Sequence, residues 1–292
     1  MKKILFVANL KKDKDLIHSK EIINSLCDKG IKVFVDVEEL VFVNKSELVP
    51  TDEIKNVDLM IVLGGDGTIL TYARKYQKYN LPIMGINLGR IGALAVCELD
   101  DYLMYIDKFL AGEYVTINHL ALECKIIYSN NKVKKFIAFN DVVVHRGLSP
   151  KILGVNIAVN NTDFSEVYTD GLIVSTPNGS SAYNLSAGGP LLSTSSNCYV
   201  ITPICPQSKT FSSLVVSKDD VVHLTVCKNE NVGKNQNVVI VDGDVEYPVN
   251  ANDIVLIKKS TKNLKMIQFS QQRSLYESVY KAVVSINRKG EK

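Results

Sequence analysis

Residues 58–68 of the 292-residue chain read DLMIVLGGDGT, an unbroken apolar run followed directly by two glycines, an aspartate and a third glycine. An apolar run of this length, bounded by glycines, is typical of a buried strand. The residues that follow indicate a helix that Thr68 caps and that ends at Asn80 and Pro82. A second apolar run, Ile83–Ile86, then indicates the next strand. This strand–helix–strand order predicts a parallel sheet of the α/β type.

The residues before this stretch repeat the same rhythm. Ile4–Ala8 indicates a strand, the apolar stripe from Ile17 to Cys27 indicates a helix that stops at Gly30, and Ile31–Val35 indicates a second strand. We therefore expect residues 1–112 to form an α/β domain that carries the glycine turn.

The pattern changes in the second part of the chain. Leu120, Leu122, Cys124 and Ile126 alternate with polar positions, which is typical of a half-buried strand. Turn-forming pairs recur from there on, and a helical period is almost absent. Residues 113–268 are therefore predicted to form a β-rich domain. The last segment, 269–292, again has a helical pattern and is expected to complete the first domain.

The composition excludes several classes of protein. The 34 lysines and arginines against 31 aspartates and glutamates leave a net charge of +3, which gives no argument for a nucleic-acid or anionic membrane partner. No apolar run approaches the length of a membrane span. The six cysteines include no CxxC pair, so no metal site on the protein is expected. We expect a cytoplasmic protein with reduced thiols.

Gly64–Thr68 is the first stretch that suggests chemistry. Glycines at such a turn let backbone N–H groups approach phosphate oxygens, and the following helix adds the positive end of its dipole. An aspartate held there, Asp66, can contact a hydroxyl or a metal ion, which suits phosphoryl transfer. The stretch matches neither GxGxxG nor GxxxxGK[ST], and alone it is also compatible with a tight turn whose acid caps the helix.

Two further polar stretches lie in the second part. Residues 139–141 are Phe-Asn-Asp, and an amide beside a carboxylate can bind the donors and acceptors of a sugar or a base. Alone, this sequence would more often be a polar hairpin corner. Residues 169–190, TDGLIVSTPNGSSAYNLSAGGP, supply hydroxyls and one aromatic face, as a nucleoside pocket requires. The alternative is a surface loop, against which the apolar Leu172–Val174 and Leu185 argue.

In this order and spacing, the three stretches resemble those of the bacterial NAD kinases. The likeness extends over nearly the whole chain and includes Asn87–Gly92, Ile201–Pro206 and Val241–Asp244. GGDGT by itself is shared with lipid kinases and is similar to the phosphofructokinase pattern, whereas the serine-rich stretch is highly specific.

The resemblance implies an activity and an architecture. Members transfer the terminal phosphate of ATP, or sometimes of polyphosphate, to the 2′-hydroxyl of the adenosine ribose of NAD, and the product is NADP. The implied fold is an α/β N-terminal domain with a parallel sheet and an all-β C-terminal domain, with the NAD site between them. The C-terminal helix is expected to pack back on the first domain. Mg²⁺, bound with ATP, is the implied cofactor, and a homodimer or homotetramer is the implied assembly.

The resemblance also assigns roles to residues. Asp66 matches the catalytic aspartate, which orients the 2′-hydroxyl and takes its proton late, because a loose transition state needs little proton removal beforehand. The implied phosphate-donor loop is Gly64, Gly65, Gly67 and Thr68. The implied NAD-binding residues are Asp66, Gly67, Asn140, Asp141, Lys151, Tyr168, Asp170, Ser181, Ala182, Tyr183, Asn184, Leu185, Ser186 and Asp244.

The chain departs from the family pattern at several positions. Ala93 stands where an aromatic residue is frequent, and Asp244 stands where an amide is usual. Gln207 and Ser212-Ser213 replace a histidine and an Arg-Pro pair. Lys11, Lys12 and Arg90 are candidates for contacts with ATP phosphates, although Lys11-Lys12 is also compatible with a solvated run of charge.

Three other functions are compatible with parts of the sequence. A lipid kinase of the GGDGT type would need an apolar acceptor pocket and would not need the serine-rich stretch. A non-catalytic NAD(H) sensor would not need Asp66. An NAD-dependent dehydrogenase would need the GxGxxG fingerprint, which the chain lacks.

Overall fold

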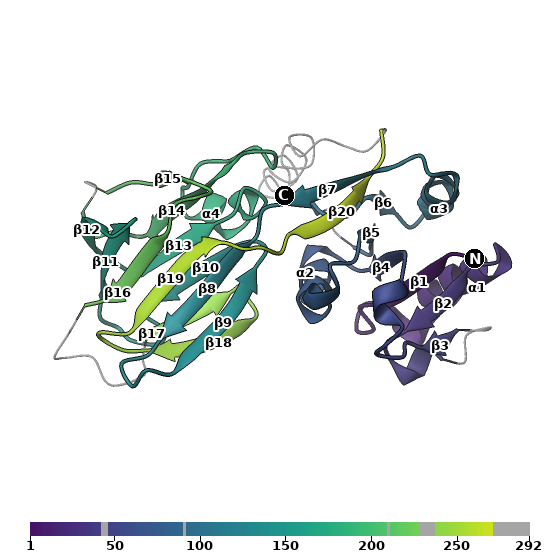
Figure 1. Cartoon of the computed structure of the whole chain (residues 1–292), viewed down its shortest axis with the longest axis horizontal. Helices are drawn as coiled ribbons and strands as arrows, with labels where there is room; N and C mark the ends of the chain where they lie inside the picture. The colour runs from purple at the N-terminus through teal and green to yellow at the C-terminus, as the bar shows by residue number, and fades with distance from the viewer. Residues whose placement is uncertain (42–45, 90–91, 209–210, 228–236, 271–292) are drawn as a thin grey trace, which may run out of the picture. The chain divides into compact units, whose positions relative to one another are not determined.

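The computed structural model describes residues 1–41, 46–89, 92–208, 211–227 and 237–270, and Figure 1 labels its helices and strands. The described chain divides into two compact units, one of residues 1–118 and 265–270 and one of residues 119–264. The sequence predicts these divisions after residues 112 and 268. Residues 271–292, for which the sequence predicts a helix, lie outside the described residues. No helix of the described part is long and apolar enough to cross a membrane.

The first unit is built on a sheet of short strands. Their bounds are β1 (Lys3–Ala8), β2 (Lys32–Val35), β3 (Glu47–Leu48), β4 (Leu59–Leu63), β5 (Ile83–Asn87), β6 (Cys97–Glu98), β7 (Val115–His119) and β20 (Leu264–Gln268). Their order is β3-β2-β1-β4-β5-β20-β7, and β6 pairs with β5. Strands β2, β1, β4, β5 and β20 pair in parallel, as the strand–helix–strand order predicts. The strands are short apolar runs because helices cover a parallel sheet and leave it buried.

The helices of this unit are α1 (Ile17–Asp28), α2 (Asp66–Lys75) and α3 (Tyr102–Ala111), with 3₁₀ turns at Lys14–Leu16, Glu38–Leu40, Ile54–Asn56 and Gln77–Tyr79. Helix α3 is absent from the sequence analysis. Its buried residues, Tyr102, Tyr105, Ile106 and Phe109, follow the spacing of one helical face, so the sequence did contain the signal. They pack into the core of this unit together with residues of β1 and β4.

The start of α2 differs from the prediction that Thr68 caps it. The N-cap is Gly65, in extended conformation, and Thr68 lies inside the first turn. The hydroxyl of Thr68 is used elsewhere, because it accepts a hydrogen bond from Asn9 Nδ2 at 3.1 Å. The predicted end is closer to the structure: α2 ends at Lys75, and Asn80 adopts the left-handed conformation after a 3₁₀ turn.

The second unit consists of two antiparallel sheets. One has the order β15 (Leu214–Ser217), β14 (Cys198–Ile204), β13 (Gly171–Ser175), β10 (Asp141–His145), β17 (Asn237–Val241) and β18 (Val245–Val249). The other has the order β12 (Thr162–Thr169), β11 (Leu153–Val159), β16 (Val222–Val226), β19 (Ile254–Lys259), β8 (Leu122–Ile127) and β9 (Val133–Ala138). A single apolar cluster contains residues from both sheets, such as Val142 and Val174 from one and Val155 and Ile257 from the other. The unit is therefore a β-sandwich.

Two of the predicted turns are hairpin connections. Asn160 and Asn161 both have positive φ, and so do Asp242 and Gly243 between β17 and β18. Two consecutive residues with positive φ are the signature of the type I′ turn, which matches the twist of antiparallel strands. Asn160-Asn161 form a two-residue connection, because Val159 pairs with Thr162. The connection between β17 and β18 has three residues, 242–244, because Val241 pairs with Val245. The serine-rich stretch contains β13, a 3₁₀ turn at Gly179–Ser181, and the short helix α4 (Tyr183–Ser186).

Candidate active site

A cavity of about 890 Å³ lies in the first unit, at the carboxyl ends of β1 and β4. Strand β1 lies between β2 and β4, so the chain leaves β1 toward one side of the sheet and leaves β4 toward the other. The loops after two such strands diverge, and open α/β sheets bind ligands in the crevice between them. The lining residues are Ala8–Lys12 after β1, Gly65–Thr68, Thr71 and Tyr72 after β4, and Gly92.

Contacts within the Gly64 turn explain its composition. A Cβ atom on Gly64 would lie 2.6 Å from Thr68 Oγ1, so a side chain at this position would displace Thr68. Asn9, which follows β1, bonds to that same hydroxyl, and its backbone N–H donates to Leu63 O at 2.9 Å. The two loops that line the cavity are thereby tied together. Asn9 was not among the predicted site residues, because only the pairing of β1 with β4 brings it here.

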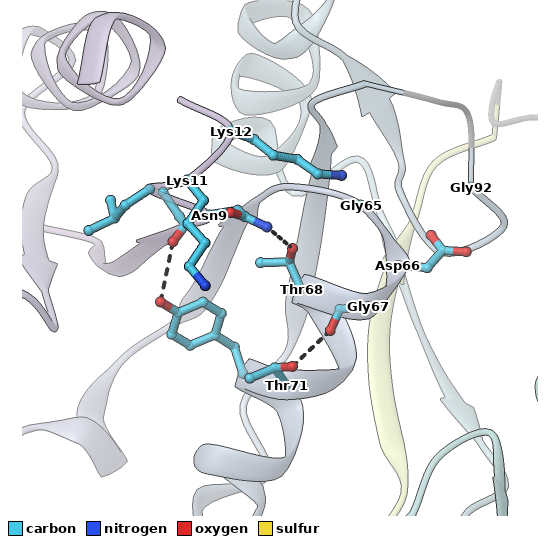
Figure 2. Close-up of a pocket in the computed structure, with 12 residues that line it drawn as sticks. Asn9, Lys11, Lys12, Gly65, Asp66, Gly67, Thr68, Thr71 and Gly92 are labelled. Carbon is cyan, nitrogen blue, oxygen red and sulfur yellow. Dashed lines mark hydrogen bonds between the residues drawn. The ribbon is translucent and has the colours of Figure 1, made fainter. Parts of the chain in front are cut away.

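The cavity presents positive charge on one side. Lys11 and Lys12 are exposed and belong to its lining. The Lys12 ammonium lies 3.9 Å from the position that a Cβ on Gly65 would occupy, and Figure 2 shows this side chain extending toward the Gly65 turn. The N-terminus of α2 opens at the same turn, and among the described residues no side chain caps it. An uncapped helix N-terminus beside an ammonium group favours an anion. Arg90 lies outside the described residues.

Asp66 begins α2 and points toward Gly92 (Figure 2). Its Oδ2 accepts a hydrogen bond from the Ala93 N–H at 2.8 Å, and its Oδ1 accepts one from the Leu94 N–H at 3.1 Å. Burial raises the pKa of Asp66, and the backbone N–H groups of residues 93–95 oppose that rise. The carboxylate is therefore desolvated, yet its charged form is supported by fixed donors.

Gly92 is required by the position of Asp66. A Cβ on Gly92 would lie 2.0 Å from Asp66 Oδ1, which is far inside van der Waals contact. The departure at Ala93 also has a structural context here, because residue 93 contacts Asp66 through its backbone N–H and not through its side chain. Loss of an aromatic ring at this position leaves that hydrogen bond in place.

In the second unit, two other segments contact residues 139–141: the turn at Asp242 and the serine-rich stretch. The Asp242 carboxylate accepts hydrogen bonds from the N–H groups of Phe139, Asn140 and Asp141 at 3.1, 2.7 and 3.1 Å. From the serine-rich stretch, Asn178 Nδ2 donates to Asn140 Oδ1 at 2.8 Å. These contacts fix both the backbone and the amide of the predicted pair.

Thr176 and Gly179 complete this arrangement. The Thr176 hydroxyl donates to Phe139 O at 2.8 Å and accepts from the Gly179 N–H at 2.9 Å. A Cβ on Gly179 would lie 2.2 Å from Asn140 O, so only glycine allows the close approach of the two loops. The sequence analysis assigned no role to Thr176 or Asn178. Both belong to residues 175–179, STPNG, and the hydroxyl of Thr176 and the amide of Asn178 are the features of the sequence that could have indicated these contacts.

Asp141 is buried, with 5% of its surface exposed. Burial, together with the negative charge of Asp242, raises the pKa of Asp141 to about 7. Tyr183 is half-exposed. Burial is the largest cause that raises the pKa of its phenol, and the charges of Cys205, Asp141 and Asp170 raise that pKa further. The carboxylates of Asp141 and Asp170 are therefore both near enough to act on the Tyr183 phenol.

Asp170 pairs with a residue that the sequence analysis left without a role. Arg146 Nε lies 2.7 Å from Asp170 Oδ1, and the Arg146 guanidinium also donates to Ser149 O. The Arg146 N–H donates to Asp170 O at 3.1 Å. The ion pair fixes the Asp170 carboxylate at the point where the chain passes from β12 to β13, and hence from one sheet to the other.

The predicted stretch Ser181–Ser186 divides into exposed and buried positions. Ala182, Tyr183 and Ser186 are exposed, and Ser181 and Leu185 are half-buried. Asn184 has no exposed surface: its Nδ2 donates to Ser180 O and Pro190 O, and its Oδ1 accepts from the Thr202 hydroxyl at 2.7 Å. In the structure Asn184 therefore holds the turn together, and its contact with NAD stays a prediction.

The remaining predicted residues lie at other points of the second unit. Tyr168 is exposed on β12, donates to Glu166 Oε1 at 2.7 Å, and lines a cavity of about 320 Å³ with Phe164, Phe211 and Gln207. Lys151 is exposed before β11, and Asp244 is exposed after the Asp242-Gly243 turn. Gln207 donates its N–H to Tyr168 O at 2.8 Å. Ser212 and Ser213 line a different cavity, of about 520 Å³, with Gly188 and Pro203.

Within the described residues, no group of three or more histidines, cysteines, aspartates or glutamates is arranged to hold a metal ion.

Comparisons with known proteins relate both units to one family. The model of the ATP-NAD kinase N-terminal domain matches residues 4–114, and that of the ATP-NAD kinase C-terminal domain matches residues 139–269. An NAD kinase of Thermoanaerobacter sp. (strain X514) is 34% identical over 271 residues, which are 92% of this chain and 94% of that protein. An NAD kinase of Lachnoclostridium phytofermentans is 34% identical over 272 residues, again 92% and 94% of the two chains.

Two solved structures share the fold. Yeast NADH kinase complexed with NADH superposes with a TM-score of 0.86 at 20% identity, over 98% of this chain and 88% of that one. An NAD kinase from Archaeoglobus fulgidus in complex with ATP gives a TM-score of 0.74 at 24% identity, over 95% and 98% of the two chains. With two domain models matched and relatives at 34% identity over nearly the whole length, the chain belongs to the ATP-NAD kinase family of phosphotransferases.

Proposed function

We propose that the protein transfers the terminal phosphate of ATP, or of polyphosphate, to the 2′-hydroxyl of the adenosine ribose of NAD. The observation that carries this proposal is the cavity at the ends of β1 and β4. It combines an uncapped helix N-terminus and two lysines with a carboxylate held by backbone N–H groups. A site for an anionic phosphate donor and an acceptor for a hydroxyl proton are what phosphoryl transfer requires.

The donor phosphates are proposed to bind at the Gly64–Thr68 turn. The Gly64 N–H donates to Ile86 O and the Thr68 N–H donates to Gly65 O, so the N–H groups of residues 65–67 at the start of α2 are the ones proposed to bind the phosphates. Lys12 adds a positive charge beside Gly65. These groups stabilise charge that moves onto the donor oxygens during transfer, and they need no reorganisation because the turn is already formed.

Mg²⁺ fits this cavity as a partner of the donor. In such sites the ion keeps several waters and is bound by one or two carboxylates together with substrate phosphates. Asp66 is the carboxylate among the lining residues and would be the protein contact. When bound, the ion neutralises charge on the transferred phosphoryl group.

Asp66 is proposed to accept the hydrogen bond of the 2′-hydroxyl and to take its proton late in the transfer. The Ala93 and Leu94 N–H groups fix the carboxylate and support its charged form, while burial makes it a better proton acceptor than an exposed aspartate. A carboxylate oxygen has lone pairs for more than one donor, so the backbone contacts leave capacity for the hydroxyl.

The second unit is proposed to bind the dinucleotide. Asn140, Asp141 and Asp170 offer acceptors and one amide, and Tyr183 offers a half-exposed ring for stacking. The other proposed contacts are Lys151, Tyr168, Asp244 and the residues 181–186. A homodimer or homotetramer is part of the proposal, and light scattering on the purified protein tests it.

The deciding experiment incubates purified protein with NAD and either MgATP or polyphosphate. A dehydrogenase specific for NADP detects the product and separates the 2′-phosphate from a phosphate on any other hydroxyl. Product from one or both donors supports the proposal and identifies the donor. NAD binding by calorimetry without product from either donor would instead indicate an NAD sensor.

A further inference from the structure

We propose that Asp242 is a positioning residue for NAD binding, which holds the backbone of residues 139–141 so that the Asn140 and Asp141 side chains keep their orientation toward the dinucleotide. The inference rests on the proposed function of that pair in binding NAD. Asp242 belongs to the Val241–Asp244 stretch, but the sequence does not show its contact with Phe139, which precedes it by 103 residues and meets it only through the pairing of β10 with β17.

The contacts of Asp242 exceed what its hairpin needs. Its Oδ1 accepts the N–H groups of both Asn140 and Asp141, its Oδ2 accepts that of Phe139, and its own N–H donates to Asp141 O at 3.0 Å. Four hydrogen bonds thus join one residue to three consecutive residues of another segment. Hydrogen bonds to an ionised acceptor are stronger than neutral ones, and each is worth more in a partly buried place.

The turn itself does not require a carboxylate. Asp242 and Gly243 both have positive φ and stand at the centre of a β-turn in which the Asp244 N–H donates to Val241 O at 3.1 Å, and Asn-Gly is a preferred pair at these two positions. Asp242→Asn therefore preserves the turn and changes the contacts. The asparagine Oδ1 can still accept two N–H groups, whereas its Nδ2 faces the Phe139 N–H, and two donors repel each other.

The substitution also changes the charge around Asp141. In the described structure the titratable groups that act on or respond to Asp141 are Asp242, from the turn between β17 and β18, and Tyr183, from α4. Strand β13 places the neutral Ser175 opposite Asp141. Removing the charge of Asp242 therefore lowers the pKa of Asp141. Asp141 is one of the residues proposed to contact NAD, so its state of protonation bears on NAD binding.

Asp253 provides a matched control. Like Asp242, it is an aspartate of the second unit whose carboxylate accepts backbone N–H groups, here those of Ser129 and Asn250 at 2.8 Å each. Neither of these residues belongs to the proposed NAD contacts. Asp253→Asn therefore removes an equivalent backbone contact at a place where NAD binding should not respond.

The experiment measures the exchange of the amides of residues 139–141 and the steady-state constants of both variants. We expect Asp242→Asn to speed exchange at these amides and to raise KM for NAD about tenfold, the equivalent of one charged hydrogen bond, while KM for ATP stays within about twofold. Asp253→Asn should leave both KM values unchanged, and Asp242→Glu, which restores the charge, should recover part of the NAD affinity.

Three results would overturn the inference: unchanged exchange at residues 139–141, faster exchange with unchanged KM for NAD, or equal increases in KM for NAD in the Asp242 and Asp253 variants. Failure of the proposed function has a different signature. In that case the unchanged protein forms no NADP, or Asp141→Asn and Asn140→Ala have no effect on NAD affinity, whatever Asp242→Asn does to amide exchange.

Discussion

Asp66 in the first unit and Asp141 in the second are both carboxylates whose pKa burial raises, but their neighbours differ. Asp66 is bonded to two backbone N–H groups, which support its charge. Asp141 lies beside a second carboxylate, Asp242, which has taken the nearby N–H groups for itself. Burial alone therefore does not assign a role to an aspartate. Fixed N–H donors support the charged form of Asp66, whereas the like charge of Asp242 raises the pKa of Asp141 to about 7.

The sharpest test of the first half of the comparison is Asp66→Asn. The variant keeps the shape of the side chain but loses the proton acceptor, so we expect kcat to fall by roughly 10²-fold or more, the range of a general acid–base group. The dissociation constant for NAD, measured by calorimetry, should change by no more than a few-fold. Turnover equal to that of the parent would remove Asp66 from the chemistry.

The second half of the comparison predicts a dependence of stability on pH. Because the pKa of Asp141 is about 7 in the fold and near 3.8 in the unfolded chain, the folded state holds a proton between these values that the unfolded state releases. The free energy of unfolding should therefore fall as pH rises from about 4 to 7, by up to about 1.4 kcal/mol per unit.

Asp141→Asn removes this contribution. Denaturant unfolding at several pH values should show a flatter profile for the variant, and between pH 5 and 8 the free energies of unfolding of the two proteins should diverge by about 2.5 kcal/mol. Asp242→Asn should flatten the profile in the same direction but less, because burial remains the larger cause. Parallel profiles for Asp141→Asn and the parent would contradict this account of Asp141.

Gly92→Ala tests whether the position of Asp66, and not only its charge, matters. The added Cβ would lie 2.0 Å from Oδ1, so the carboxylate or its loop must move. A misplacement of a catalytic group by about 1 Å can reduce turnover by up to about 10²-fold, and we expect a loss in kcat of about tenfold. In the Asp66→Asn background the same substitution should cost much less, because two changes that act through one group are not additive. Additive losses would show that Gly92 acts independently of Asp66.

Much of the first unit followed from its sequence, since its strands are apolar runs and its turns carry glycine. The prediction missed helix α3, although the apolar period of that helix is present in the sequence. It also placed Thr68 at the N-cap position of α2, which Gly65 occupies in the structure. A cap depends on local φ and ψ, whereas the Thr68 hydroxyl bonds to Asn9, a contact that the sequence does not reveal.

The site shows the same division. The residue types at 66, 140 and 141 were visible in short motifs, but their partners were not. Asp66 is held by backbone N–H groups, which every residue except proline carries, so the side chain of Ala93 gave no signal. Asp242 reaches residues 139–141 only through the register of β10 and β17, in which Val142 faces Val241. Contacts set by sheet register lie beyond any local pattern.

The smallest expected effect concerns the positive side of the Asp66 cavity. Lys12→Ala should raise KM for ATP several-fold, because an exposed ammonium contributes modestly in water, and the effect should shrink as salt increases. Lys14→Ala is the matched control, since Lys14 is also exposed, two residues further on, but is not part of the cavity lining. Equal effects of the two variants would reduce Lys12 to general surface charge. A larger effect of Lys12→Ala at low salt would support binding of the donor phosphates at the Gly65 turn, beside which the Lys12 ammonium lies.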